Sequence, residues 1–141
     1  MVSVRKDGWA QRGGIDRVLV LGSGKTLQVD EKVRSKDYDD ILLEYWSDVG
    51  RQSLGWVAKD LSCDFIAYAF VPSQRCFLLP FPILRRAWHS FGKEWIRCGE
   101  QGLHGFRKVE ADNGNYTTVS VAVPVDLLMS ALSDSMIVTW E

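Results

Sequence analysis

Three residues between positions 16 and 32 have types and a spacing that suit metal-assisted hydrolysis. If the chain turns about Ser23, facing residues have numbers that sum to 46, and Asp16 lies opposite Asp30. Directly opposed residues on one sheet face have Cβ atoms about 4.5–5.5 Å apart. Two carboxylates that close repel each other unless a cation lies between them. Magnesium suits this position, because it is a hard ion that binds oxygen ligands and often uses only one or two protein carboxylates.

Lys32 adds a positive charge to the same place. It lies two residues beyond Asp30, and therefore on the same face of an extended strand. An ammonium group beside a metal-bound water orients the nucleophile and stabilises the charge that develops on a phosphate. One hairpin thus supplies two metal ligands and a cation. The plainer alternative is a surface hairpin in which Lys32 forms an ion pair with one of the two acids.

These residues resemble the signature of the PD-(D/E)xK nuclease superfamily, which includes restriction enzymes, Holliday-junction resolvases and phage exonucleases. Thirteen residues separate Asp16 from Asp30, which belongs to the run Val29-Asp30-Glu31-Lys32. The segments 42–45 (Leu-Leu-Glu-Tyr) and 63–68 (Cys-Asp-Phe-Ile-Ala-Tyr) are also similar to phage and prophage proteins assigned to this fold. The resemblance extends over roughly residues 11–97.

The resemblance implies a restriction-endonuclease-like core: an α/β (α+β) domain with a mixed central sheet and one main covering helix. It implies Mg²⁺ or Mn²⁺ as the cofactor, held by Asp16, Asp30 and the backbone carbonyl of Glu31, with Lys32 as the catalytic lysine. The implied reaction is hydrolysis of a DNA phosphodiester by in-line attack of a metal-activated water. Glu44, in a strand, would support this site or, equally, belong to a structural ion pair.

The rest of the sequence predicts the elements that position this hairpin. The length of 141 residues, with 46% hydrophobic and 25% charged residues, is typical of a single ordered domain, with residues 1–14 as an N-terminal arm. The strand over 41–46 is nearly all apolar, which predicts burial on both faces. The expected elements are a hairpin over 15–34 with its turn at 22–24, strands over 41–46, 63–71, 75–80 and 117–123, helices over 82–97 and 125–132, and a terminal strand or tail over 136–140.

Charge is balanced over the whole chain but not along the predicted helix. The net charge of −1 argues against a strongly basic nucleic-acid binder. On the helix over 82–97, however, the basic residues recur at intervals that place them on one face. A solvated helix face is the plainer interpretation, and contact with a DNA backbone is the alternative. The candidate DNA contacts are Arg34, Lys36, Arg86, Lys93 and Arg97.

A second function belongs to a different class. Only fifteen residues precede Asp16 and none is glutamate. Two alternatives follow: the nuclease core lacks the helix that normally begins it, or the chain starts late relative to its relatives. A catalytically inactive protein with the same fold would instead bind and inhibit a host protein complex, as phage anti-defence proteins do. The sequence shows no signal peptide and no apolar run of about 20 residues. We therefore expect no membrane partner and a location in the cytoplasm, that of the host cell if phage-encoded, with a homodimer as an open alternative.

Overall fold

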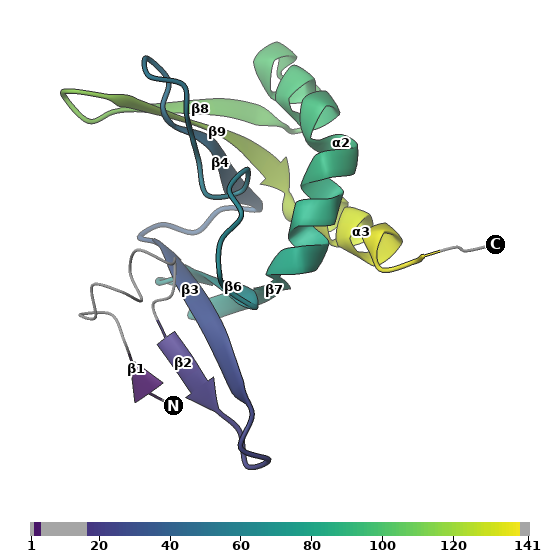
Figure 1. Cartoon of the computed structure of the whole chain (residues 1–141). Helices are drawn as coiled ribbons and strands as arrows, with labels where there is room; N and C mark the ends of the chain where they lie inside the picture. Colours follow the sequence, from purple (N-terminus) through teal and green to yellow (C-terminus); the bar gives the residue numbers. More distant parts are fainter. Residues whose placement is uncertain (1, 4–16, 139–141) are drawn as a thin grey trace. The chain divides into compact units, whose positions relative to one another are not determined.

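The computed structural model describes the backbone of residues 2–3 and 17–138, and side chains from residue 20 onward (Figure 1). The chain divides into two compact units, each described by itself: Met1–Tyr38 with Leu61–Pro82, and Asp39–Asp60 with Ile83–Glu141. The predicted mixed α/β class is confirmed. The strands, however, belong to two sheets rather than to one central sheet. The prediction of one domain over residues 1–141 stays a prediction.

The first unit is a five-stranded mixed sheet. Its strands lie in the order β1 (Val2–Ser3), β2 (Arg17–Val20), β3 (Thr26–Arg34), β6 (Phe65–Phe70) and β7 (Arg75–Pro80). Strands β3 and β6 run parallel, and the other neighbouring pairs are antiparallel. The segment that carries the candidate chemistry, β3, is thus an inner strand.

The register of the predicted hairpin is confirmed over the part of β2 that the structure describes. Leu19 pairs with Leu27, which is the predicted register. The turn closes through the Leu21 N–H, which donates to the Lys25 carbonyl at 2.8 Å. Gly24 adopts a φ of 84°, a left-handed conformation that glycine reaches without steric cost. The turn chemistry therefore sets the pairing locally.

Side chains alternate between the two faces of a sheet along each strand, and the two faces of the first sheet differ in burial. Along β6, Ile66, Tyr68 and Phe70 are buried, and their face also carries the buried Asp30 of β3. Leu79 of β7 pairs with Ile66 and adds to this core. The first unit thus holds an acid within an apolar face.

The second unit contains a four-stranded antiparallel sheet and two helices. The strands lie in the order β5 (Ser53–Leu54), β4 (Asp40–Asp48), β9 (Thr117–Pro124) and β8 (Arg107–Asp112). Helix α3 (Val125–Ser135) follows β9 directly. Helix α2 (Phe81–Gln101) begins at the end of the first unit and continues through the second. No helix in the described part of the chain is long and apolar enough to cross a membrane.

The structure differs from the sequence prediction in three of these elements. Strand β4 is not buried on both faces, because Ile41 and Leu43 are buried whereas Leu42 and Glu44 are only half-buried. Such alternation is typical of an antiparallel sheet with one face towards a core. Strand β8 was not predicted, since its sequence is largely charged and its pairing with β9 relies on backbone hydrogen bonds. Helix α2 extends four residues beyond the predicted end at residue 97.

The end of α2 has a clear local cause. Gly102 has a φ of 66°, and its N–H donates to the Gly99 carbonyl at 3.3 Å. The Leu103 N–H donates to the Cys98 carbonyl at 2.9 Å. This pair of hydrogen bonds is the Schellman arrangement, which satisfies carbonyls that the helix end leaves without partners. Gly102 therefore ends the helix.

Candidate functional site

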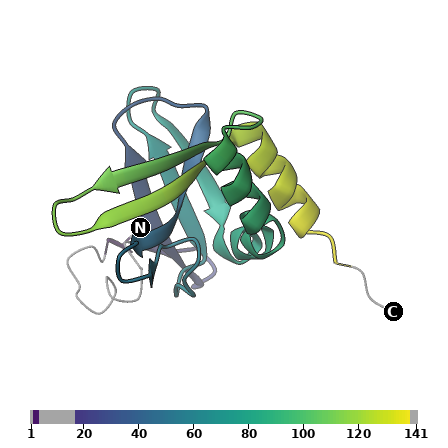
Figure 2. The ribbon, with the colours of Figure 1, turned by 90° about the horizontal axis from the view of Figure 1, so that it is seen from above.

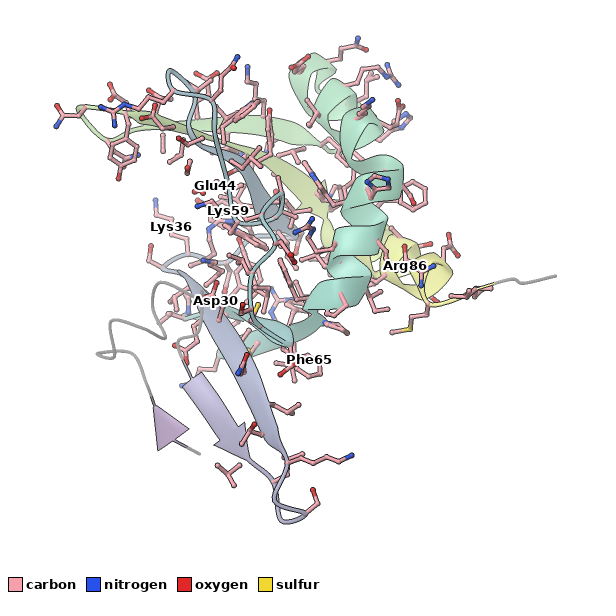
Figure 3. All side chains as sticks on the ribbon, viewed as in Figure 1. Asp30, Lys36, Glu44, Lys59, Phe65 and Arg86 are labelled. Atoms are coloured by element: carbon pink, nitrogen blue, oxygen red, sulfur yellow. The ribbon has the colours of Figure 1, made fainter. Side chains whose placement is uncertain are left out.

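Asp30 and Lys32 form the centre of the candidate site on β3. The Lys32 Nζ lies 3.1 Å from an oxygen of the Asp30 carboxylate. Asp30 is 6% exposed, and it is the one buried carboxylate among the side chains that the structure describes (Figure 3). A carboxylate in an apolar environment needs charge pairing or hydrogen bonds to remain ionised. The structure thus brings together the predicted acid and the predicted lysine.

The segment before β6 adds two residues beside this pair. Burial raises the pKa of the Cys63 thiol to about 12, and the negative charges of Asp30 and Asp64 add to the rise, whereas Lys32 opposes it. The Asp64 carboxylate accepts a hydrogen bond from the Gln28 N–H at 2.8 Å, and the Asp64 N–H donates to the Gln28 carbonyl at 2.7 Å. Asp64, which directly precedes β6, therefore holds the start of this strand against β3, and this is a positioning role.

The sequence does not predict Cys63 as part of this site. Its sequence position gives no signal, because a single cysteine before an apolar strand is most often a small core residue. Only the parallel pairing of β3 with β6 brings it to Asp30, which lies far from it in the sequence. The pKa of the Cys63 thiol therefore responds to the charge at Asp30.

We expect the Cys63 thiol to react slowly in the folded protein. The thiolate is the nucleophile in alkylation, and a raised pKa keeps Cys63 protonated. At pH 8, iodoacetamide should modify the exposed Cys76 at least about tenfold faster than Cys63, as measured by peptide mass spectrometry. Because the folded state holds the Cys63 proton more tightly than the unfolded state does, stability should also fall as the pH rises from about 9 towards 12. Equal alkylation rates at the two cysteines would contradict this expectation.

The sequence also predicts Asp16, Glu31 and Glu44 as residues of this site. Asp16 lies outside the described residues, so its place opposite Asp30 stays a prediction. Glu31 has its side chain on the opposite face of β3, although its backbone carbonyl remains a candidate ligand. Glu44 belongs to the second unit, where its carbonyl accepts a hydrogen bond from the Val57 N–H at 3.1 Å. Its supporting role also stays a prediction.

Of the two basic residues that follow the motif, Arg34 is already engaged. Its guanidinium donates to the Tyr68 hydroxyl at 3.0 Å and lies 4.1 Å from the centre of the Tyr38 ring. Such a cation–π contact, together with the hydrogen bond, stabilises the end of β3. Lys36, in contrast, is exposed in the segment after β3 (Figure 3). Lys36 is therefore the better placed of the two to meet a phosphate.

The basic residues of α2 are exposed, as the sequence predicts. Arg86 and Lys93 lie on the solvent side of the helix (Figure 3 shows Arg86). Arg97 donates through its Nε to Glu94 at 2.9 Å, and its guanidinium also pairs with the second carboxylate oxygen. This pairing lowers the pKa of Glu94 and raises the pKa of Arg97. Because Glu94 neutralises Arg97, Arg86 and Lys93 provide most of the unpaired positive charge along this row.

The residues around Asp30 determine how well a divalent metal fits. The described residues include no cluster of three or more His, Cys, Asp or Glu side chains arranged to hold a metal ion. A metal at Asp30 would therefore depend on the Glu31 carbonyl and on Asp16. Comparisons with known protein families, with curated proteins and with solved structures found no match.

Proposed function

We propose that this protein hydrolyses DNA phosphodiester bonds with Mg²⁺ or Mn²⁺ bound at Asp30. The observation that carries the proposal is the Asp30–Lys32 pair, with its 3.1 Å separation and its buried carboxylate on an inner strand. A buried carboxylate held beside a lysine in an apolar environment is typical of functional sites. The predicted hairpin register, confirmed between β2 and β3, also supports the proposal.

Each residue has a definite role in this proposal. Asp16, Asp30 and the Glu31 carbonyl would hold the metal, which would supply an activated water when bound. Lys32 orients that water and stabilises the negative charge that develops on the phosphate. Exposed basic residues, among them Lys36, contact the DNA backbone. A restriction-endonuclease-like core is part of the same proposal.

Cleavage of supercoiled, linear and branched DNA with Mn²⁺ or Mg²⁺ tests the proposal. We expect the wild-type protein to cleave at least one of these substrates and to lose activity in EDTA. Asp30→Asn and Lys32→Met should each reduce the rate by at least about a hundredfold, because they remove a ligand and a charge-stabilising group. Intact DNA in every reaction of the wild-type protein would contradict the proposal.

A second ion pair of the chain provides a matched control. On β8, the Lys108 Nζ lies 3.1 Å from the Glu110 carboxylate, with the same spacing of two residues as the pair on β3. Both side chains of this pair are exposed. Lys108→Met and Glu110→Gln should therefore leave cleavage unchanged. If they reduced the rate as much as Lys32→Met does, the effect would come from overall charge, and the assignment to β3 would be wrong.

An apolar surface on the first unit favours a second candidate function. Val33 is 58% exposed and Leu78 is 52% exposed. Both lie on the sheet face opposite Asp30, where Val33 pairs with Ala69 and Leu78 pairs with Ala67. Exposed apolar groups that gather on one face are typical of protein interaction sites. We therefore propose, as the alternative, a non-catalytic protein that binds and inhibits a host protein complex through this face.

Affinity capture from a host lysate tests the alternative. The wild-type protein should recover a specific complex, and Val33→Lys together with Leu78→Lys should abolish recovery. Asp30→Asn should not affect it, because Asp30 lies on the other face of the sheet. Recovery of nothing, together with metal-dependent cleavage, would exclude the alternative. Sedimentation of the purified protein separates binding to a partner from homodimer formation.

A further inference from the structure

A pocket of about 390 Å³ lies between the two helices of the second unit. Figure 2 shows α3 beside α2. The volume is within the range of sites that bind small molecules, roughly 300–1,000 Å³. The lining residues are Phe91, Glu94, Trp95, Cys98, His104, Phe106, Leu127, Ser130, Ala131 and Asp134. None of them belongs to the Asp30–Lys32 site.

Each helix lines this pocket with residues from one of its faces. The lining residues of α2 lie at positions 91, 94, 95 and 98, and those of α3 at positions 127, 130, 131 and 134. Each set has the spacing i, i+3, i+4, i+7, which places its members on one helix face. The two faces therefore form the walls of the pocket along about two turns of each helix.

The segment after α2 adds two more residues to the lining. Gly102 ends the helix, and His104 and Gly105 then adopt φ values of 56° and 83°. These left-handed conformations turn the chain back, so that His104 and the buried Phe106 reach the pocket. Two backbone hydrogen bonds hold this turn. The Leu103 N–H donates to the Cys98 carbonyl, and the Phe106 N–H donates to the Leu103 carbonyl at 2.9 Å. The pocket is therefore built by a defined turn rather than by a loose loop.

The lining combines an aromatic surface with negative charge. The Phe91 and Trp95 rings stack with centroids 5.8 Å apart and an angle of 22° between their planes. Glu94 and Asp134 are the carboxylates of the lining, which contains no lysine or arginine. The pKa of Glu94 is lowered by Arg97, so Glu94 is ionised at neutral pH. Asp134 forms no ion pair with another residue in the described part of the chain.

We propose that this pocket binds a small organic cation with a flat apolar body and an amidinium or ammonium group. The flat body would lie against the aromatic rings, where removal from water is favourable. The positive group would face Asp134, because Arg97 already pairs with both carboxylate oxygens of Glu94. The ring faces add a cation–π attraction. A neutral or anionic ligand of the same shape gains none of these charge interactions. The proposal concerns the second unit alone and does not depend on nuclease activity.

Benzamidine and its uncharged analogue benzamide test the proposal with the full-length protein. The two probes share a flat ring, so their difference in affinity measures the preference for positive charge. We expect benzamidine to bind at least about fivefold more tightly than benzamide, as for a solvent-accessible ion pair. Ligand-observed NMR titrations give both dissociation constants. Equal affinity of the two probes, or no binding of benzamidine, would overturn the proposal.

Two substitutions on α3 show whether the charge effect comes from the pocket. Asp134→Asn should weaken benzamidine binding about fivefold and leave benzamide binding unchanged. Asp126→Asn makes the same change in the first turn of α3, outside the lining, and should leave both affinities unchanged. If Asp126→Asn weakened benzamidine binding as much as Asp134→Asn does, a general charge effect would explain the result and the proposal would fail.

A third variant tests the pocket by filling it. Leu127 lies in the lining and is 43% exposed, so a larger side chain is compatible with folding. Leu127→Trp should reduce benzamidine binding at least tenfold by occupying the space between the helices. A thermal melt followed by circular dichroism checks that the variant is folded. Unchanged binding to the folded variant would place the probe elsewhere and overturn the proposal.

Discussion

Replacing Lys32 with methionine is expected to lower the free energy of unfolding by about 2–4 kcal/mol, because the change removes the ammonium group that lies 3.1 Å from a buried carboxylate. Lys32 is 30% exposed, but the carboxylate of Asp30 is only 8% exposed. Removal of one partner from such a pair costs more than the pair itself contributes, since the remaining charge stays desolvated. Urea denaturation of the wild type and the variant measures the change.

A double-mutant cycle measures the interaction energy between Asp30 and Lys32 separately from the interactions that each makes with other groups. Asp30→Asn with Lys32→Met should be less destabilised than the sum of the two single variants, because the double variant contains neither charge of the pair. We expect a coupling energy of about 1–3 kcal/mol between the two positions. A coupling below about 0.5 kcal/mol would mean that other groups stabilise Asp30, and the pair would not define the site.

The exposed pair on β8 again provides the comparison. Lys108→Met removes a cation at the same separation from its carboxylate, but both side chains are in contact with solvent. Exposed ion pairs contribute about 0.2–1 kcal/mol, so the loss should stay within this range. A difference between the two lysine variants therefore measures the effect of burial at Asp30. Cleavage assays of Lys32→Met must be made where the variant remains folded, so that lost stability is not mistaken for lost catalysis.

Gly55→Ala is expected to destabilise the second unit by at least about 3 kcal/mol, because the added methyl group meets backbone atoms that cannot move freely. A Cβ at position 55 would lie 2.3 Å from the carbonyl oxygen of Glu44 and 2.5 Å from its carbonyl carbon. The Gly55 N–H also donates to the Tyr45 carbonyl at 2.9 Å, which holds the segment against β4. Relief of the clash would separate this segment from β4.

The consequence extends to the core, because Val57 follows two residues later and is fully buried. Its N–H donates to the same Glu44 carbonyl that the new methyl group would contact. Gly50→Ala is the matched control, since a Cβ there meets nothing closer than 3.6 Å, at a side-chain oxygen of Asp48. We expect that control to change stability by less than about 1 kcal/mol, and similar losses in both variants would contradict the argument.

Local features of the sequence were sufficient for the hairpin and the helices. The register of β2 with β3 follows from the glycine turn, and Leu19 pairs with Leu27 as expected. The apolar stripe predicts α2 because its period is a property of the segment itself. The closeness of Asp30 and Lys32 follows from the period of two along a strand. In each case the interacting groups are close in the sequence, or are joined by one short turn.

Long-range pairing could not be inferred in the same way. Strand β8 pairs through its backbone with β9, and its charged side chains give no apolar pattern. The division of the strands into two sheets depends on which strand edges pair with each other. Backbone hydrogen bonds between strands are the same for every sequence, so the side chains alone do not identify these pairs. The place of Cys63 beside Asp30 requires the parallel pairing of β3 with β6. These features depend on contacts between residues that are far apart in the chain.

The sequence by itself therefore determined the hairpin, its register and the pairing of an acid with a lysine two residues away. The tertiary structure alone decided that Asp30 is buried, that Arg34 is engaged by Tyr68, and that two helices form a pocket lined with carboxylates and aromatic rings. The physical reason is that turns and side-chain periods act over a few residues. Burial, charge environment and pocket shape arise only when distant segments pack together.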